Sequence, residues 1–281
     1  MYKYQSFSQY SLVNLLNDQI FMNHYEAFND PFECWCEILT DFPTLSENSP
    51  RLREFLDAWG YSEVNDEVKG FYSDFVSSPK VDSSYPEKLV NAAKITCFSK
   101  RPDNLLMWSH YADGLRGFCI EFDSHSLLSN NSKLANLYDV QYQDKPAVID
   151  MALASVYSDL AEHHNKVIES TTDESVIDFH DECLFNCVLS ENAIYMKMLA
   201  TKPLDWQYEE EKRVIYMASQ NDDSLLNYPA SSIKKVIFGE KMPQYQVKTI
   251  KDAILAKGLS PQFCYAKRAK GSFDVQIEEH I

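Results

Sequence analysis

The 281-residue chain is poor in glycine, with 7 glycines against 17 tyrosines and 16 phenylalanines. It contains no glycine-rich phosphate loop, no regular strand–helix alternation and no internal repeat. These absences argue against a doubly wound nucleotide-binding fold and against a repeat protein. They predict one large, aromatic-rich globular domain, because a chain of this length can bury a full core.

Positive charge is also scarce. Lysine and arginine number 26 and aspartate and glutamate 42, which gives a net charge of −16. A protein that captures DNA or RNA through its phosphates needs the opposite balance, so general nucleic-acid binding is not expected. A small nucleotide remains a possible partner wherever a few cationic side chains converge.

Signals for export, membrane insertion and metal binding are lacking. No run approaches 18 apolar residues, and the N-terminus has no signal-peptide core. The seven cysteines include no CxxC pair and lie in apolar runs, as expected of reduced core thiols. His163 and His164 have no partner at metal-ligand spacing. We therefore expect a cytoplasmic protein with no membrane contact and no metal.

Apolar periodicity predicts strands separated by helices of very uneven length. The expected strands are 2–4, 19–23, 94–99, 117–122, 209–217, 233–238, 262–266 and 272–278. The main helices expected around them are 9–16, 103–112 and 244–256. Two longer apolar stripes, 147–168 and 173–199, predict a helical hairpin. The fold class is therefore α+β: a mixed, mostly antiparallel sheet with surrounding helices and a long helical hairpin insert at about 147–199 in a single domain, 1–281.

The densest motif, Met107–Gly114, places Trp108, His110 and Tyr111 on one short helix before a chain reversal. Element ends of this kind often carry functional groups. His110 is a candidate acid, base or ligand donor. In the alternative, Trp108 and Tyr111 fill the core and His110 bonds to the backbone.

A second motif lies in Lys202–Tyr216. If Glu209–Tyr216 is a strand, its two-residue period puts Glu209, Glu211 and Arg213 on one face, with the carboxylates about 7 Å apart. Such a pair repels, and one pKa rises unless Arg213 compensates. The alternative is an edge strand with a solvated ion pair.

Two short segments complete the candidates. The turn Phe28–Glu33 offers Asn29 and Asp30 as polar tips, or serves only as a capping turn. The strand Tyr2–Tyr4 offers Tyr4 and also Lys3, which either meets a phosphate or is solvated.

Together these blocks resemble a widespread bacterial family of unknown function, domain of unknown function 2971. Its members share a YKY strand, an FNDPFE turn, a CFS strand, an MWSHYA block and a WxxExExR segment, in the order found here. The separated site is also similar to that of ADP-ribosyltransferase-like folds, which carry a late Glu-x-Glu. Glu209 and Glu211 match that position, although the early strand offers Lys3 in place of His or Arg.

The second resemblance implies an NAD-using transferase or glycohydrolase, acting as a bacterial toxin or phage-defence effector on an unknown macromolecular acceptor. NAD would be its substrate. Glu211 would stabilise the oxocarbenium-like transition state and Glu209 would orient the acceptor. Trp108 and Tyr111 would stack on the nicotinamide ring. Arg213, Lys3 or Arg116 would neutralise the pyrophosphate.

Two other classes of function stay open. One is a nuclease-like hydrolase, with or without a metal, that uses Asp30, Glu33, Glu209 and Glu211. The other is a non-catalytic module that senses a nucleotide or a partner through the same aromatic cleft. A divalent-metal requirement would indicate the first, and ligand binding without turnover would indicate the second.

Overall fold

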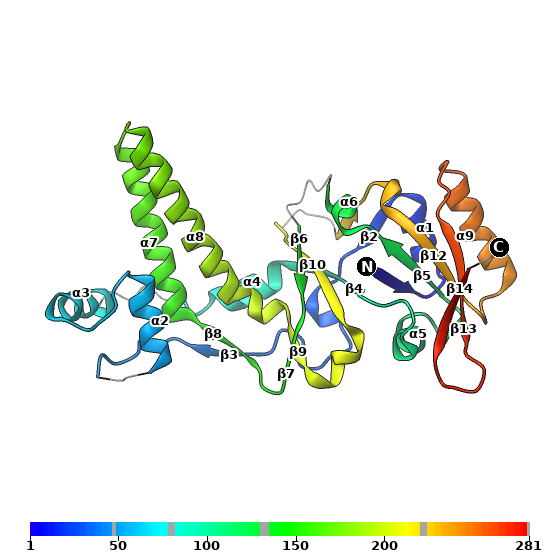
Figure 1. Cartoon of the computed structure of the whole chain (residues 1–281), viewed down its shortest axis with the longest axis horizontal. Coiled ribbons are helices and arrows are strands. Elements are labelled where there is room, and N and C mark those ends of the chain that lie inside the picture. Colours follow the sequence, from blue (N-terminus) through cyan, green and yellow to red (C-terminus); the bar gives the residue numbers. More distant parts are fainter. Residues whose placement is uncertain (47–48, 78–81, 130–134, 220–223, 280–281) are drawn as a thin grey trace. The chain divides into compact units, whose positions relative to one another are not determined.

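The computed structural model describes residues 1–46, 49–77, 82–129, 135–219 and 224–279. The chain divides into two compact units, each built from separate segments (Figure 1). Unit 1 comprises Met1–Glu33, Leu89–Asp144 and Lys202–Ile281, and unit 2 comprises Cys34–Lys88 and Lys145–Thr201. The single-domain organisation stays a prediction.

An eight-stranded sheet forms the centre of the described part of unit 1. Its strands lie in the order β14 (Val275–Glu279), β13 (Gln262–Arg268), β12 (Ile233–Gly239), β5 (Phe118–Phe122), β1 (Tyr2–Gln5), β4 (Ala93–Ser99), β10 (Glu211–Met217) and β6 (Asn136–Asp139). Within the described part of this sheet, only β12 and β13, which flank helix α9 (Gln244–Leu255) in the chain, pair in parallel. The α+β class with a mixed, mostly antiparallel sheet is thereby confirmed.

Two apolar cores use alternate residues of these strands. In β5, Phe118 and Ile120 belong to the first core and Cys119 to the second. Helices α1 (Gln9–Leu16), α6 (Ser124–Leu128) and α9 contribute to the first core, and α5 (Leu105–Tyr111) contributes to the second. Alternation of this kind is what a strand with two buried faces requires.

The remaining elements of unit 1 are short and lie around the sheet. They are β2 (Gln19–Phe21), η1 (Tyr25–Ala27), β7 (Gln141–Gln143), η2 (Leu204–Glu209), β11 (Leu225–Asn227) and η3 (Ala230–Ser232). Two elements cross the boundary between the units along the chain: α4 (Tyr85–Ala92) and β9 (Thr201–Pro203).

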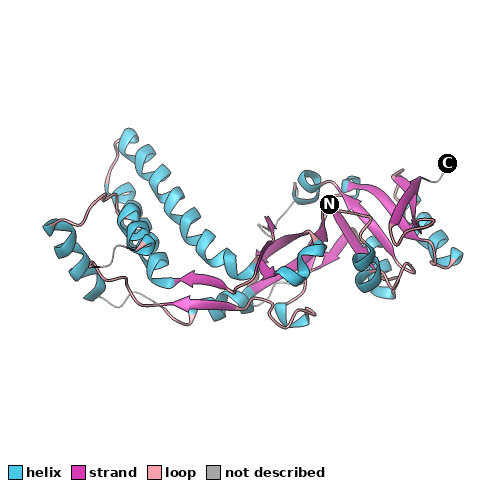
Figure 2. Ribbon diagram, turned by 60° about the horizontal axis from the view of Figure 1, so that its bottom comes forward, coloured by secondary structure: helices cyan, strands magenta, loops and turns pink. Residues whose placement is uncertain are grey.

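Unit 2 contains the helical hairpin expected from the sequence, since α7 (Met151–Ser170) and α8 (Glu174–Leu199) pack side by side (Figure 2). The prediction that the first of these helices begins near 147 is wrong. Residues Ala147–Asp150 form strand β8, which pairs in parallel with β3 (Cys36–Leu39). Here the strand partner overrides the helical apolar spacing.

Local signals decide where the other helices of unit 2 begin. Helix α2 (Pro50–Ala58) starts with a proline, and the hydroxyl of the preceding Ser49 accepts from the Leu52 amide. Helix α3 (Asp66–Ser77) follows Asn65, whose side chain accepts from the Val68 amide. Asn65 thereby satisfies a free backbone donor at that end.

A tight turn after α5 positions the end of that helix. Gly114 and Leu115 have φ of 60° and 70°, in the left-handed region. A Cβ at Gly117 would lie 2.2 Å from the Gln5 carbonyl oxygen, and one at Gly239 would lie 2.1 Å from the Leu115 carbonyl oxygen. No side chain fits either contact, so glycine lets β1 and β12 approach the turn closely.

The seven cysteines, all of which lie in the described ranges, form no disulfide. None of the helices in the described ranges combines the length and apolar character that a membrane span needs. The cytoplasmic location stays a prediction.

Candidate functional site

The site begins at a gap in the sheet between β1 and β4. These two fully described strands pair only at Tyr2 and Ser99, whereas β1 pairs with β5 along its whole length. Further along β4, Ile95 forms an isolated bridge with Asn23. The backbone of β4 between these two contacts therefore does not pair with β1.

Lys3 crosses this gap. Its ammonium donates to the Thr96 hydroxyl at 2.7 Å and to the Cys97 carbonyl at 2.9 Å. The lysine thus satisfies an acceptor that a continuous ladder would have bonded. Burial lowers the pKa of Lys3, opposed by the neighbouring Cys97 and Glu211.

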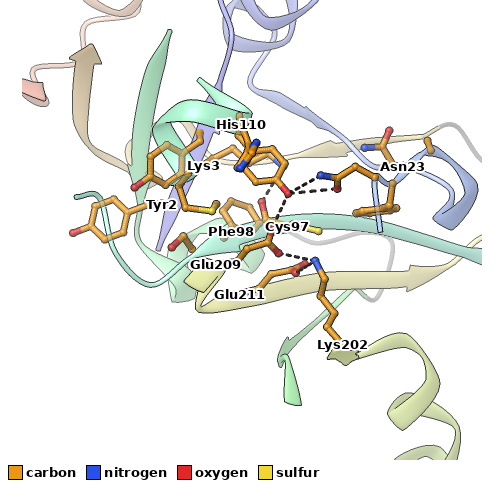
Figure 3. Close-up of a pocket in the computed structure, with 16 residues that line it drawn as sticks. Tyr2, Lys3, Asn23, Cys97, Phe98, His110, Lys202, Glu209 and Glu211 are labelled. Atoms are coloured by element: carbon orange, nitrogen blue, oxygen red, sulfur yellow. Dashed lines mark hydrogen bonds and ion pairs between the residues drawn. The ribbon is translucent and has the colours of Figure 1, made fainter. Parts of the chain in front are cut away.

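A cavity of about 320 Å³ opens at the gap, large enough for a small ligand (Figure 3). Four segments that are distant in the chain line it. The lining residues are Tyr2, Lys3, Tyr4, Asn23, Ala27, Phe28, Asn29, Cys97, Phe98, Ser99, Met107, His110, Tyr111, Lys202, Glu209 and Glu211. We call it the aromatic pocket.

Two glutamates share one lysine at the edge of this pocket (Figure 3). Lys202 donates to Glu209 Oε2 at 2.6 Å and to Glu211 Oε2 at 3.1 Å. All three side chains are 3% exposed. The other oxygen of Glu209 accepts from the Tyr111 hydroxyl, which also lies 3.4 Å from the Asn29 amide. The carboxylate of Glu209 is thus oriented from two sides.

Arg213 extends this network away from the pocket. Its Nε donates to Glu211 Oε1 at 2.8 Å, and its two terminal nitrogens donate to the carboxylate of Glu33, one of them at 2.9 Å. The guanidinium also faces the Phe28 ring at 5.7 Å. Arg213 is fully buried, and β10 lies between β4 and β6. The solvated ion pair on an edge strand is therefore wrong.

The prediction that the two glutamates share one face of a strand is wrong. Strand β10 begins at Glu211, and Glu209 is the last residue of η2. Between them Glu210 takes a left-handed conformation with φ of 44°. This reversal, rather than strand alternation, brings both carboxylates to Lys202.

The network separates the acidities of the two glutamates. Burial raises the pKa of Glu209, and the nearby Glu211 raises it further, against the opposing effect of Lys202. Burial would also raise the pKa of Glu211, but Arg213 and Lys202 outweigh burial and lower this pKa to about 2. Glu211 therefore stays ionised, while Glu209 is the better proton acceptor.

Helix α5 is fastened to η2 by Asn104. The side chain of Asn104 accepts from the amides of Leu106 and Met107 and donates to the Tyr208 carbonyl at 2.6 Å. The same residue therefore caps the helix and sets its distance from Glu209. Burial and the contact with Glu209 raise the pKa of Tyr111, so its hydroxyl stays a donor.

The structure brings seven of the eleven residues singled out from the sequence to the aromatic pocket. They are Lys3, Tyr4, Asn29, His110, Tyr111, Glu209 and Glu211.

The other four do not line it. Trp108 is fully buried against Tyr4, with ring centroids 5.2 Å apart, and donates to the Pro102 carbonyl. Asp30 is buried in its own turn, where it accepts from the Phe32 amide. Arg213 lies behind Glu211. Arg116 is exposed and contacts the Asp113 carbonyl.

Sequence reasoning missed Lys202, Asn23 and Cys97. Lys202 stands at the head of a segment that was otherwise singled out, yet nothing in the sequence distinguishes a buried lysine from a solvated one. Cys97 was read as a core thiol. It pairs with Arg213 across the strands and lines the pocket, where burial raises its pKa.

Residues 107–214 match the family model described as "Protein of unknown function (DUF2971)". Over these residues, which are less than half of the chain, the chain is similar to this family. The match includes Met107–Tyr111 of α5, Lys202 and both glutamates. No curated protein and no solved structure matches the chain significantly. The likeness to ADP-ribosyltransferase-like folds stays a prediction.

Proposed function

We propose that the protein binds an N-ribosyl nucleotide such as NAD in the aromatic pocket and cleaves the bond between base and ribose. The ribosyl group would pass to water or to a macromolecular acceptor, an activity that suits a toxin or defence effector. The observation that carries the proposal is Glu209: a buried carboxylate of raised pKa opens onto a cavity with aromatic walls and a lysine.

The chemistry follows from the two glutamates. When the carbon–nitrogen bond breaks, its electron pair leaves with nicotinamide and the ribose carbon becomes positive. Glu211, held ionised, stabilises that charge. The attacking hydroxyl gives its proton to Glu209, which Tyr111 and Lys202 hold in position. Because Trp108 does not line the pocket, we assign stacking on the base to the aromatic rings that do line it.

A non-catalytic nucleotide sensor is the second candidate, and one observation favours it. Every oxygen of Glu209 and Glu211 already has a donor: Tyr111 and Lys202 for the first, Arg213 and Lys202 for the second. A satisfied network can shape a binding pocket without reacting.

No observation of this kind favours the hydrolase. Glu33, Glu209 and Glu211 hold Arg213 or Lys202, and Asp30 does not line the pocket. Within the described ranges no group of three or more His, Cys, Asp or Glu side chains is arranged to hold a metal ion.

The test is nicotinamide release from NAD by wild type, Glu209→Gln and Glu210→Gln. Glu210 is the matched control, because it is the adjacent glutamate and its side chain is 40% exposed. Glu209→Gln should bind NAD and lose about 10²–10³ in turnover, and Glu210→Gln should match wild type. Wild type that binds NAD without releasing nicotinamide would indicate the sensor. Wild type that does not bind NAD would refute both nucleotide functions.

A further inference from the structure

A second cavity, of about 330 Å³, adjoins the aromatic pocket. Lys3, Tyr4, Asn23 and Tyr111 line both. Apart from these shared residues, the second cavity borders Leu15 and Ile120 of the first core, and the aromatic pocket borders Phe98 of the first core and Met107 of the second. Because Lys3, which crosses the gap between β1 and β4, lines both cavities, the two cavities meet at that gap.

The chemistry of the second cavity differs from that of the first. Apart from Lys3 it is lined by neutral side chains, many of which carry hydroxyl or amide groups. The polar members are Gln5, Ser6, Ser8, Ser11, Asn14, Gln19 and Asn23. We call it the amide pocket. It suits a neutral group with several donors and acceptors, such as a sugar or the edge of a base.

Two of these amides are free to bind such a group. Asn14 and Asn23 are half-buried, and within the described residues their side chains have no hydrogen-bond partner. By contrast, Gln19 donates to Asn227, and Ser8 and Ser11 form the cap of α1. A ligand that completes the hydrogen bonds of a half-buried amide removes the free-energy cost of leaving that amide unpaired.

Lys3 supplies a charge at the junction. Its ammonium has three donors, of which Thr96 and Cys97 accept two. No carboxylate of the described residues forms an ion pair with it within 4 Å. One N–H therefore remains for an anionic group that lies between the two pockets.

We propose that the amide pocket is a second subsite, which takes the distal nucleoside of a dinucleotide whose phosphate linker contacts Lys3. The assignment rests on the proposed function for the nucleotide in the aromatic pocket. It makes the substrate a dinucleotide rather than a mononucleotide. Asn14 and Asn23 then act as specificity residues for the distal nucleoside.

Calorimetric binding of NAD, nicotinamide mononucleotide and AMP tests this with wild type, Asn14→Leu, Asn14→Asp and Asn17→Leu. Asn17 is the matched control, because it follows α1 directly and is exposed outside both cavities. Wild type should bind NAD at least about tenfold more tightly than the mononucleotide. In both Asn14 variants most of this difference in affinity should be lost, and AMP should bind more weakly than to wild type. Asn17→Leu should bind all three nucleotides as wild type does.

The outcomes separate this inference from the proposed function. Equal affinity of wild type for NAD and the mononucleotide, or unchanged NAD and AMP binding in both Asn14 variants, overturns the second subsite. Wild type that releases no nicotinamide refutes the cleavage proposal. If that wild type still binds AMP, and the Asn14 variants bind AMP more weakly, the second subsite is supported. If none of the three nucleotides binds to wild type, both proposals are refuted.

Discussion

Lys202→Met removes the cation that Glu209 and Glu211 share. Glu211 keeps Arg213 at 2.8 Å, so the loss falls mainly on Glu209, which keeps only the Tyr111 hydroxyl. Breaking a buried pair costs about 3–5 kcal/mol when the remaining charge stays. Glu209 can instead take up a proton, which costs about 1.4 kcal/mol for each pH unit above its usual value of 4.5.

The cost of protonating Glu209 therefore sets how much the free energy of unfolding falls. We expect the free energy of unfolding to fall by about 3 kcal/mol at pH 7 and by about 1 kcal/mol at pH 5.5. The sign follows from linkage: a carboxyl whose folded pKa is raised binds its proton more tightly in the folded state. The folded variant is thus favoured as pH falls toward 4.5.

Urea denaturation at both pH values measures this difference. Lys212→Met is the matched control, because Lys212 follows Glu211 in β10 and pairs with Asp139 at 3.2 Å where both side chains are partly exposed. It should cost at most about 1 kcal/mol at either pH. A loss for Lys202→Met that equals the control, or that does not change between pH 7 and 5.5, would refute the reasoning.

Three further predictions concern the same network. Arg213→Ala should lower the free energy of unfolding by about 3–5 kcal/mol, because Glu33 and Glu211 lose a buried partner; a urea-measured loss below about 1 kcal/mol would contradict this. The pKa of Glu211 is lowered to about 2, so its stabilising contribution is complete above its usual pKa of 4.5 and disappears as pH falls toward 2. Wild type and Glu211→Gln should therefore converge in stability at low pH, and a constant difference down to pH 2 would argue against an ionised Glu211. Glu210→Gly should raise the unfolding free energy by up to about 1 kcal/mol, since φ of 44° strains a side chain there; a lower melting temperature would show that no strain is relieved.

Where residues next to a helix in the chain mark its start, the sequence could predict that start. Helix α1 spans Gln9–Leu16, as the apolar spacing indicates, and Ser49 with Pro50 marks the start of α2. The order of the motifs likewise predicted the likeness to the family whose model matches residues 107–214, because it depends on sequence alone. These features need no knowledge of the partner strands.

The gathering of distant motifs could be predicted only in outline. The strand Tyr2–Gln5, the turn at Asn29, the end of α5 and Glu209 do line one pocket. Their polar and aromatic character exceeds what a core needs, which is a signal in the sequence. The gap between β1 and β4 that creates the cavity leaves no such signal, because it depends on which residues fail to pair.

The residues by themselves determined the fold class, the starts of α1 and α2 and, in outline, the motifs that would meet. Tertiary structure alone decided which side chain of α5 is buried and which faces the pocket: Trp108 is buried and Tyr111 reaches Glu209. It also decided that Arg213 bonds to Glu33, 180 positions away in the chain. The physical reason is that burial and strand order set the environment of a charge. The sequence alone does not show whether a lysine or arginine is solvated or buried.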